Sequence, residues 1–274
     1  MNATLSRLMD RGYPLLLSRH RYLVAQLARR DVLARYKGSV LGLGWSVLFP
    51  LLILLSYTFV FRTVFKARWP GGGDTTEEFA LQVFAGLVIF NLFAELLNRA
   101  PRLVLEQPNL VKRVVFPLEV LAWVAVASSM FHAVLGLAIL LAAVAWAGPG
   151  LTAWAFLVPL VLAVTVPSLL GLAWLLSGLG VFVRDIGHAM GPAVTMLMFM
   201  SPVLYPAKAL PEVLAALLWL NPLTIPIENL RLLLLEGRAP HWQALFFYTL
   251  AGLVFAFVAH RLFDRVKPAF ADEV

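Results

Sequence analysis

The chain has 274 residues, of which 61% are hydrophobic and only 14% are charged, and its mean hydropathy is +0.84. Soluble globular domains carry about 25% charged residues, so this composition excludes an ordinary soluble protein and indicates a protein embedded in a membrane. The formal net charge of +7 would suggest nucleic acid as a partner of a soluble chain, but no recognition motif accompanies the basic residues. Because cysteine is absent, the chain has no disulfide, thiol nucleophile or cysteine-ligated metal.

The first predicted unit is a basic arm, residues 1–43, that leads into an apolar segment. We expect an interfacial helix here, since Leu16, Leu23, Leu27 and Ala34 recur at helical spacing on one face. A solvated basic tail is the alternative. The cations of the arm are expected to lie at the cytoplasmic membrane surface, where anionic lipid head groups attract them. They are Arg29, Arg30, Arg35 and Lys37.

Six apolar segments are candidates to cross the bilayer, which takes about 20 residues. Together they define a predicted transmembrane unit, residues 44–262, followed by a cytoplasmic tail, residues 263–274. With both termini cytoplasmic, sixteen Lys and Arg side chains lie in or at the edges of cytoplasmic segments and six lie on the other side, which satisfies the positive-inside rule. The predicted fold is therefore an all-α integral membrane protein with six transmembrane helices per subunit. The predicted spans are residues 44–61, 79–97, 118–146, 153–183, 189–204 and 242–262.

Between the last two predicted spans, prolines divide the sequence into apolar pieces that are too short to cross a membrane. Proline stops helices, and broken backbone at membrane depth is tolerated only where protein or a water-filled cavity satisfies its polar groups. We therefore expect a re-entrant pair of short helices over residues 205–240, on the outer side and next to a translocation path. A plain external loop on the membrane surface is the alternative. The prolines are Pro202, Pro206, Pro211, Pro222, Pro226 and Pro240.

The sequence lacks the residues that ATP hydrolysis or acid–base catalysis would need. None of its five lysines lies in a Gly-Lys-Ser/Thr phosphate-binding loop. The groups within predicted spans that titrate near neutrality are little more than Glu95 and His132, which lie in different segments without a neighbouring nucleophile. We interpret His132 as a neutral packing residue, with a functional role as the alternative. The sequence therefore predicts no catalytic residue, metal site or cofactor on this chain.

A short polar segment between the second and third predicted spans has the character of a docking helix. Asn109 can cap a helix, and the apolar residues that follow can form one packing edge. Lys112 and Arg113 can reach acidic groups on a soluble partner. Such a helix would transmit force between a membrane unit and a motor. Taken alone, a solvated connector is the alternative interpretation of this segment.

Three stretches carry a family resemblance that covers nearly the whole chain. They are Arg35-Tyr36-Lys37-Gly38-Ser39-Val40-Leu41-Gly42 with Trp45 and Pro50, Asn109-Leu110-Val111-Lys112-Arg113 with Phe116-Pro117-Leu118-Glu119, and Ser201-Pro202-Val203-Leu204-Tyr205-Pro206. In these stretches the chain resembles the permease subunits of polysaccharide ABC exporters of the ABC-2 type. Within that group it looks closest to the O-antigen and teichoic acid export branch, and capsule exporters are the nearest alternative.

The resemblance implies a homodimer that pairs with two copies of a separate P-loop ATPase, which would hold the MgATP. This assembly would move polyprenyl-diphosphate-linked polysaccharide of the O-antigen type, in lipopolysaccharide biosynthesis, across the bacterial cytoplasmic (inner) membrane. By the same resemblance, the ATPase-coupling residues would be Asn109, Leu110, Val111, Lys112, Arg113, Val114 and Phe116. The residues that receive the lipid diphosphate would be Arg29, Arg30, Arg35, Tyr36 and Lys37.

Aromatic side chains suit a path for sugars, because their faces stack on sugar rings without tight hydrogen bonds and conduction needs weak, repeated contacts. Our candidates are Trp45, Phe49, Tyr57 and Tyr205, although aromatic residues also gather at membrane interfaces as anchors.

Two other classes of membrane protein stay open. A membrane-embedded enzyme acting on lipid-linked sugars would need an essential carboxylate or histidine. A secondary transporter would need ion ligands in repeated broken helices, and the sequence has no internal repeat.

Overall fold

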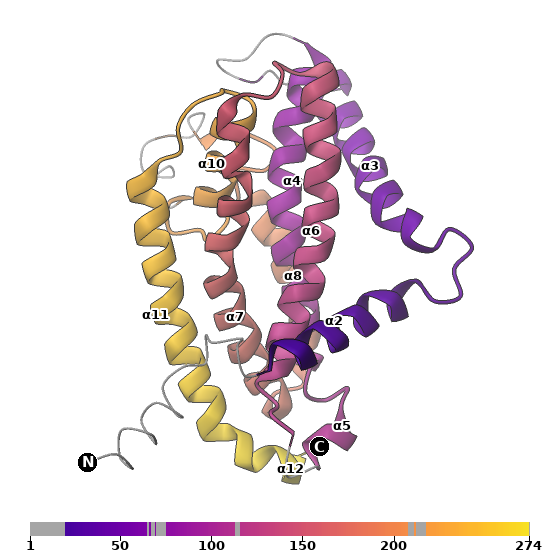
Figure 1. The fold of residues 1–274 in the computed structure, drawn as a ribbon, viewed down its shortest axis with the longest axis vertical. Coiled ribbons are helices and arrows are strands. Elements are labelled where there is room, and N and C mark those ends of the chain that lie inside the picture. The colour runs from indigo at the N-terminus through magenta and orange to yellow at the C-terminus, as the bar shows by residue number, and fades with distance from the viewer. Residues whose placement is uncertain are drawn as a thin grey trace.

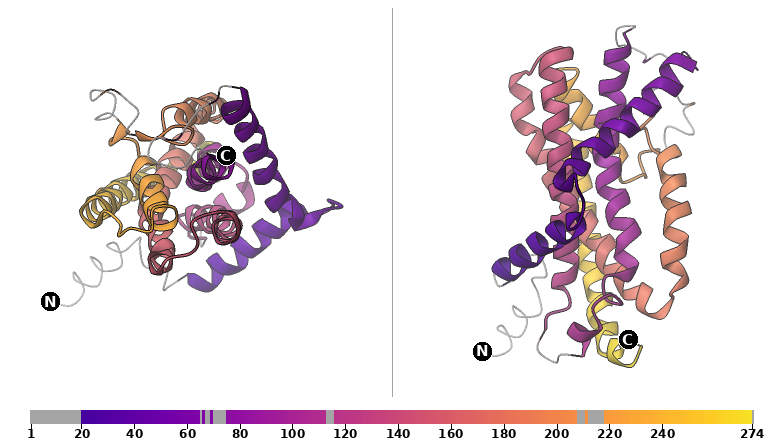
Figure 2. Two further views of the ribbon diagram at one scale, coloured as in Figure 1. Left: turned by 90° about the horizontal axis from the view of Figure 1, so that it is seen from above. Right: turned by 90° about the vertical axis from the view of Figure 1, so that its right-hand side faces the viewer.

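The computed structural model describes residues 20–64, 66, 69, 75–112, 116–207, 211 and 218–273. Long helices stand side by side and α2 lies across them towards one end (Figure 1). Seen from above, α2 and α3 run along one flank of the bundle (Figure 2). The main helices in chain order are α2 (Arg21–Tyr36), α3 (Trp45–Thr58), α4 (Thr76–Arg99), α5 (Pro108–Val111), α6 (Val120–Ala147), α7 (Val158–Phe182), α8 (Asp185–Phe199), α10 (Thr224–Leu234), α11 (Trp242–Val266) and α12 (Phe270–Glu273).

Five helical segments within the described residues are long and apolar enough to cross a membrane. They contain or largely overlap the first four and the last of the predicted spans, so the all-helical, multi-pass membrane class is confirmed. Short 3-10 or π-helical turns extend several of the α-helices, as η2 (Phe59–Val64) extends α3. The five segments are Gly42–Val64, Thr76–Arg102, Val120–Ala147, Ala153–Phe182 and Trp242–Glu273.

The remaining predicted span, residues 189–204, has the wrong boundaries. The helix found there, α8, begins at Asp185 and ends at Phe199, and its 15 residues are fewer than a crossing takes. Residues 200–204 form turns instead of a last helical turn. Pro202 explains this early end, because a proline disfavours helical backbone at the residue before it and lacks an N–H of its own.

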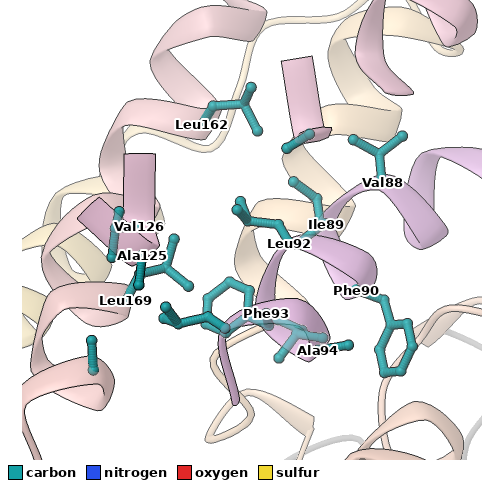
Figure 3. Packing of buried hydrophobic residues seen from close by; sticks show 14 of the residues in the cluster. Val88, Ile89, Phe90, Leu92, Phe93, Ala94, Ala125, Val126, Leu162 and Leu169 are labelled. Atoms are coloured by element: carbon teal, nitrogen blue, oxygen red, sulfur yellow. The ribbon is translucent and has the colours of Figure 1, made fainter. Parts of the chain in front are cut away.

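Helix α4 is the centre of the bundle and packs against α3, α6, α7, α8 and α10. In its most apolar stretch 72% of the residues are buried, more than in any of the other four candidate spans. Ile89 and Phe93 are completely buried among side chains of α6 and α7, such as Ala125 and Leu169 (Figure 3). A helix that is apolar all round is expected to lie in the interior, and α4 has this character along most of its length.

Small residues let the helices approach each other closely, as in other membrane bundles. At Gly180 in α7, a side chain would overlap the carbonyl oxygen of Pro101 in the 3-10 turn η3 (Ala100–Arg102), which follows α4. This turn begins the connection that leads to α5. The C-terminal end of α4, which the sequence predicts to be cytoplasmic, is therefore in direct contact with the backbone of α7.

A single buried guanidinium joins the broken segment after α8 to the centre of the bundle. Arg231 in α10 is only 3% exposed. Its Nε and Nη2 donate to the carbonyl oxygen of Gln82 in α4, at 3.1 and 2.9 Å. Its Nη1 donates to the carbonyl oxygen of Pro202 at 2.7 Å, and Nη2 also donates to that of Val203 at 3.0 Å. The carbonyl groups of Pro202 and Val203 lie where helical hydrogen bonding has ended, so the guanidinium replaces the missing backbone donors there, while the carbonyl group of Gln82 belongs to α4 itself.

The surroundings of Arg231 complete this arrangement. Nη1 also contacts the Glu228 carboxylate at 3.2 Å, and the Trp69 ring lies 4.5 Å from the guanidinium carbon. Gly86 in α4 leaves the space for this contact, since a Cβ there would lie 3.0 Å from Cα of Val203 and 3.1 Å from Nη2. Burial lowers the pKa of Arg231 to about 10, so the side chain keeps its charge at neutral pH.

We expect Arg231→Gln to destabilise the folded permease by about 3–5 kcal/mol, because the change leaves buried carbonyl groups and Glu228 without a partner. The melting temperature in detergent measures this loss. Arg238→Gln is the matched control, since Arg238 is 74% exposed and pairs only with Glu236 at the surface. Equal melting temperatures for the two variants would contradict the role assigned to Arg231.

Candidate functional site

Helix α2 is attached to α6 by a small apolar cluster at its N-terminal half. Val24 and Ala28 are buried against Val120 and Val124 at the start of α6. Val32, one turn further along α2, is also buried. These small and β-branched side chains let α2 lie close to α6, and the arm is helical as the sequence predicts.

The predicted apolar face of α2 is only partly right. Leu23 and Leu27 are half-buried beside the apolar cluster, but Ala34 is exposed. Leu16 lies outside the described residues. The buried positions recur every four residues, at 24, 28 and 32, because the face is rotated towards Asp31 and Arg35, which have partners on α4.

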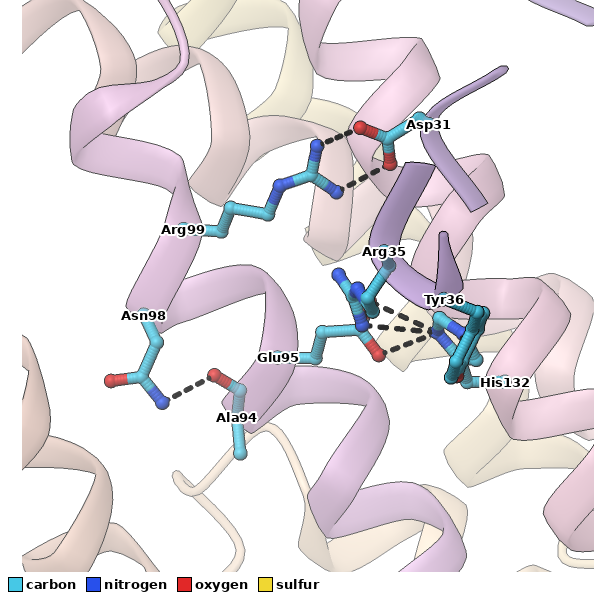
Figure 4. A network of polar contacts seen from close by, with 8 residues as sticks. All are labelled: Asp31, Arg35, Tyr36, Ala94, Glu95, Asn98, Arg99 and His132. Carbon is cyan, nitrogen blue, oxygen red and sulfur yellow. Dashed lines mark hydrogen bonds and ion pairs between the residues drawn. The ribbon is translucent and has the colours of Figure 1, made fainter. Parts of the chain in front are cut away.

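The first of these polar contacts joins Asp31 of α2 to Arg99 at the end of α4 (Figure 4). Arg99 Nη1 donates to Asp31 Oδ2 at 2.7 Å, and Nη2 pairs with Oδ1, so the contact has two parallel hydrogen bonds. Both side chains are about three-quarters buried. Burial alone would raise the pKa of the Asp31 carboxyl, but the hydrogen bonds and charge of Arg99 hold it below the ordinary value of 3.8.

The second contact lies one helical turn away and includes α6. Arg35 Nη1 lies 2.9 Å from Glu95 Oε1, and the other oxygen of Glu95 lies 2.9 Å from His132 Nδ1. Because a carboxylate only accepts, Nδ1 donates to Glu95, and Nε2 shares a hydrogen bond of 2.8 Å with the Tyr36 hydroxyl. Burial raises the pKa of Tyr36, which keeps this hydroxyl protonated. We call these six residues, Asp31, Arg35, Tyr36, Glu95, Arg99 and His132, the α2 polar network.

The α2 polar network corrects the interpretation of His132 made from the sequence. This residue does more than pack, since both ring nitrogens have polar partners. Glu95 and His132 lie in different helices, as predicted, but they are in direct contact. Sequence reasoning also missed Asp31 and Arg99. On both α2 and α4 an acidic residue is followed four positions later by a basic one, Asp31 by Arg35 and Glu95 by Arg99. This repeated spacing is the signal that could have identified them.

A cavity of about 430 Å³ opens beside the α2 polar network, between α2, α3, α4 and α6. Arg35 and Tyr36, predicted to receive a lipid diphosphate, line it together with Trp45 and Phe49, predicted to contact glycan. The structure thus brings two groups of predicted site residues into one place. Polar side chains at membrane depth are costly unless they serve a purpose, so this cavity is the main candidate site.

The other predicted site residues of these two groups lie outside that cavity. Arg29, Arg30 and Lys37 are exposed on α2 or at its C-terminal end, and Arg30 borders a second, smaller cavity. Two aromatic residues lie by α8 instead. They are Tyr57, whose hydroxyl contacts Met198 Sδ at 3.3 Å, and Tyr205, whose hydroxyl donates to the carbonyl oxygen of Phe199 at 3.0 Å.

The predicted docking segment is helical over one turn, α5 (Pro108–Val111). Gln107, not Asn109, is its N-cap residue, because Pro108 takes the first helical position, where its missing N–H has no cost. Asn109 and Lys112 are exposed, whereas Val111 is buried and Leu110 and Phe116 pack on the core. Arg113 and Val114 lie outside the described residues.

The docking segment is close to the α2 polar network. A cavity of about 190 Å³ is bordered by Leu110 of α5, by Glu106 and Gln107 just before it, and by Asp31 and Arg99. A displacement of α5 would therefore first disturb the ion pair of Asp31 with Arg99, which attaches α2 to α4. Within the parts of the chain that the structure describes, no three His, Asp or Glu side chains are grouped so as to hold a metal ion.

The sequence model of one protein family, described as ABC-2 type transporter, matches residues 22–235, which includes α2, the cavity and α5. This match covers more than half of the chain. The protein belongs to the ABC-2 type transporter family. It is therefore a transport permease and not an enzyme, and membership implies an ABC transporter in which an ATPase partner works with the permease.

Several relatives match this ABC-2 permease along nearly its whole length. It is 27% identical to the O-antigen export system permease protein RfbA of Myxococcus xanthus over 260 residues, which is 94% of this chain and 97% of the relative. It is 25% identical to a protein of the same name from Klebsiella pneumoniae over 252 residues, 91% of this chain and 94% of the relative. A second Klebsiella pneumoniae protein of that name is 24% identical over 253 residues.

We expect Asp31→Asn to destabilise the permease by about 2 kcal/mol near neutral pH, because the change removes a charged partner of Arg99. The pKa of Asp31 is lowered in the folded state, so its contribution is complete above the unfolded value and is lost as pH falls through the folded value. The difference in melting temperature between wild type and variant should therefore be constant from about pH 8 to about pH 5 and should shrink below about pH 4. Asp185→Asn, an exposed acid without an ion pair to a described residue, is the control. A difference that grows below pH 4 would contradict this assignment.

Proposed function

We propose that this ABC-2 permease is the channel-forming subunit of an ATP-driven exporter of polyprenyl-diphosphate-linked polysaccharide of the O-antigen type. One observation carries the proposal, namely the nearly end-to-end similarity to relatives named as O-antigen export permeases. The cavity beside α2 supports it, because it combines aromatic walls with polar and charged groups at one end of the bundle. The membrane crossed would be the bacterial cytoplasmic membrane.

The arm and the cavity would receive the lipid diphosphate. Arg29 and Lys37 are exposed cations on one edge of the site, suited to phosphate oxygens. Arg35, in contrast, is paired with Glu95, so its charge is balanced until an anion competes for it. The first binding step would therefore involve the exposed cations, followed by exchange of Glu95 for phosphate at Arg35. Tyr57 and Tyr205, beside α8, would contact the glycan further along the path.

Energy for export would come from a separate ATPase that holds the MgATP and docks on α5 and the residues after it. Asn109 and Lys112 are exposed for such a contact, while buried Val111 attaches the segment to the bundle. The positions of α2, α5 and α12 support one orientation, because the three helices lie towards the same end of the molecule (Figure 1). That end would be cytoplasmic.

The unit in the membrane would be a homodimer of six-span subunits. Helix α3 has no buried residue, and apolar side chains on several of its faces are exposed, including Phe49 at 60% and Leu55 at 67%. A large apolar surface of this kind suits a second copy of the chain as well as lipid. Helix α8 together with the turns that follow it, residues 185–204, would make the fifth crossing, and residues 205–240, with the largely buried α10, would be the re-entrant segment. Residues 208–210 and 212–217 of that segment lie outside the described residues.

The first test is to purify the tagged permease from its native membrane in mild detergent and to identify the proteins that come with it by mass spectrometry. We expect a P-loop ATPase in equal amount with the permease. Its absence, under conditions in which the permease stays dimeric, would contradict the proposed exporter.

We expect Lys112→Glu with Arg113→Glu to abolish export of the polysaccharide while membrane insertion is unchanged, because reversed charges would repel the acidic groups of the ATPase. Surface polysaccharide and co-purified ATPase are measured together. Arg238→Glu, a charge change at the other end of the bundle, is the control. Normal export in the double variant would remove the docking role from this segment.

A further inference from the structure

Four uncharged polar residues outside the α2 polar network line the 430 Å³ cavity. They are Ser46 of α3, whose hydroxyl donates to the carbonyl oxygen of Leu43 at 2.6 Å, Asn91 and Asn98 of α4, and Ser129 of α6. Ser129 is only 1% exposed, and its hydroxyl has no hydrogen-bond partner among the described residues. A buried hydroxyl without a partner is costly, so its presence at a cavity wall points to a ligand that supplies the missing hydrogen bond.

The two amides also have free hydrogen-bonding capacity. Asn98 Nδ2 donates to the carbonyl oxygen of Ala94 at 2.9 Å, which leaves Oδ1 as an acceptor. The Asn91 side chain lines the cavity and has no hydrogen bond to any described residue, so its donor and its acceptor are both available to a ligand. Asn91, Glu95 and Asn98 follow one another at helical spacing, and Ser129 and His132 do so on α6. The two helices thus place polar groups along one side of the cavity, among apolar lining residues such as Val88, Leu92 and Ala133.

The opposite wall is aromatic and apolar. Trp45 and Phe49 of α3 line the cavity and are partly exposed. Aromatic faces on one side and neutral amide and hydroxyl groups on the other form the lining that suits an uncharged sugar ring. A lipid tail would leave the polar groups unpaired, and a second phosphate would find no unpaired cation in the lining, since Arg35 is paired with Glu95. The volume lies within the range of about 300–1,000 Å³ for small-molecule sites.

We propose that this cavity is a subsite for one uncharged sugar, the unit next to the diphosphate, and that Asn91 and Ser129 determine which sugar is accepted. The inference rests on the proposed function and adds a specificity site to it. The diphosphate would lie towards Arg35 and Lys37, and the sugar would extend between α3 and α4. A site built to hydrogen-bond a substrate hydroxyl discriminates strongly against substrates that lack it.

The experiment measures ATP hydrolysis by the complete permease–ATPase complex in nanodiscs, with two defined probes. One probe is polyprenyl diphosphate that carries a single hexose or N-acetylhexosamine, and the other is polyprenyl diphosphate without sugar. For Ser129→Ala and for Asn91→Ala, we expect the half-saturating concentration of the best sugar-bearing probe to rise about threefold to tenfold, as for the loss of one or two hydrogen bonds. The half-saturating concentration of the sugar-free probe and the maximal rates should stay unchanged.

Ser177→Ala is the control. Ser177 of α7 is similarly buried, its hydroxyl donates to the carbonyl oxygen of Trp174 at 3.2 Å, and it does not line the cavity. It should leave both half-saturating concentrations unchanged. Ser129→Ala should also keep the wild-type melting temperature or raise it, because removal of an unpartnered buried hydroxyl costs little.

Two results would overturn the subsite. Ser129→Ala and Asn91→Ala could leave the sugar-bearing probe unaffected, or they could shift both probes equally, which would indicate a general effect on phosphate binding or packing. A wild-type complex that neither probe stimulates would contradict the proposed function itself, and this is seen before any variant is made.

Discussion

The structure depends on one constraint, that polar and charged groups within an apolar bundle must find their partners inside the protein. Lipid offers no hydrogen bonds, so each such group either pairs or costs several kcal/mol. The described residues meet this constraint mainly along α4. Its N-terminal part gives a carbonyl oxygen to Arg231, and its C-terminal part carries Glu95 and Arg99, which hold α2. The central position of α4 and its apolar character elsewhere follow from these two attachments.

These attachments also explain how distant parts of the permease can act together. The cavity beside α2, the docking segment α5 and the α2 polar network share residues or lie next to one another. A ligand that competes for Arg35 would weaken the same contacts that a movement of α5 would disturb. Substrate binding and ATPase docking would then act on one set of contacts, and no long pathway through the bundle is needed.

Most of the architecture could be predicted from composition and hydropathy, because a membrane span needs only length and apolar character. The early end of α8 could not be predicted in this way, because the apolar pattern continues past Phe199 and does not show that the helix stops before Pro202. The role of Arg231 was hidden as well. In the sequence it is one more cation in a proline-rich segment, and its partners are backbone groups that no pattern of side chains reveals. For the site, the types of residue were predicted, but the contact of Glu95 with His132 depends on how α4 and α6 pack.

The close contact of Gly180 with Pro101 has a mechanical consequence. Side chains between two helices act as a soft layer, because their rotamers can adjust when one helix is pushed. At this point backbone meets backbone, and there is no such layer. A force applied to the segment that contains α5 would therefore reach α7 through backbone atoms, and α7 packs closely along α11. The smallest residue in the chain thus gives this junction a direct backbone contact between two helical segments.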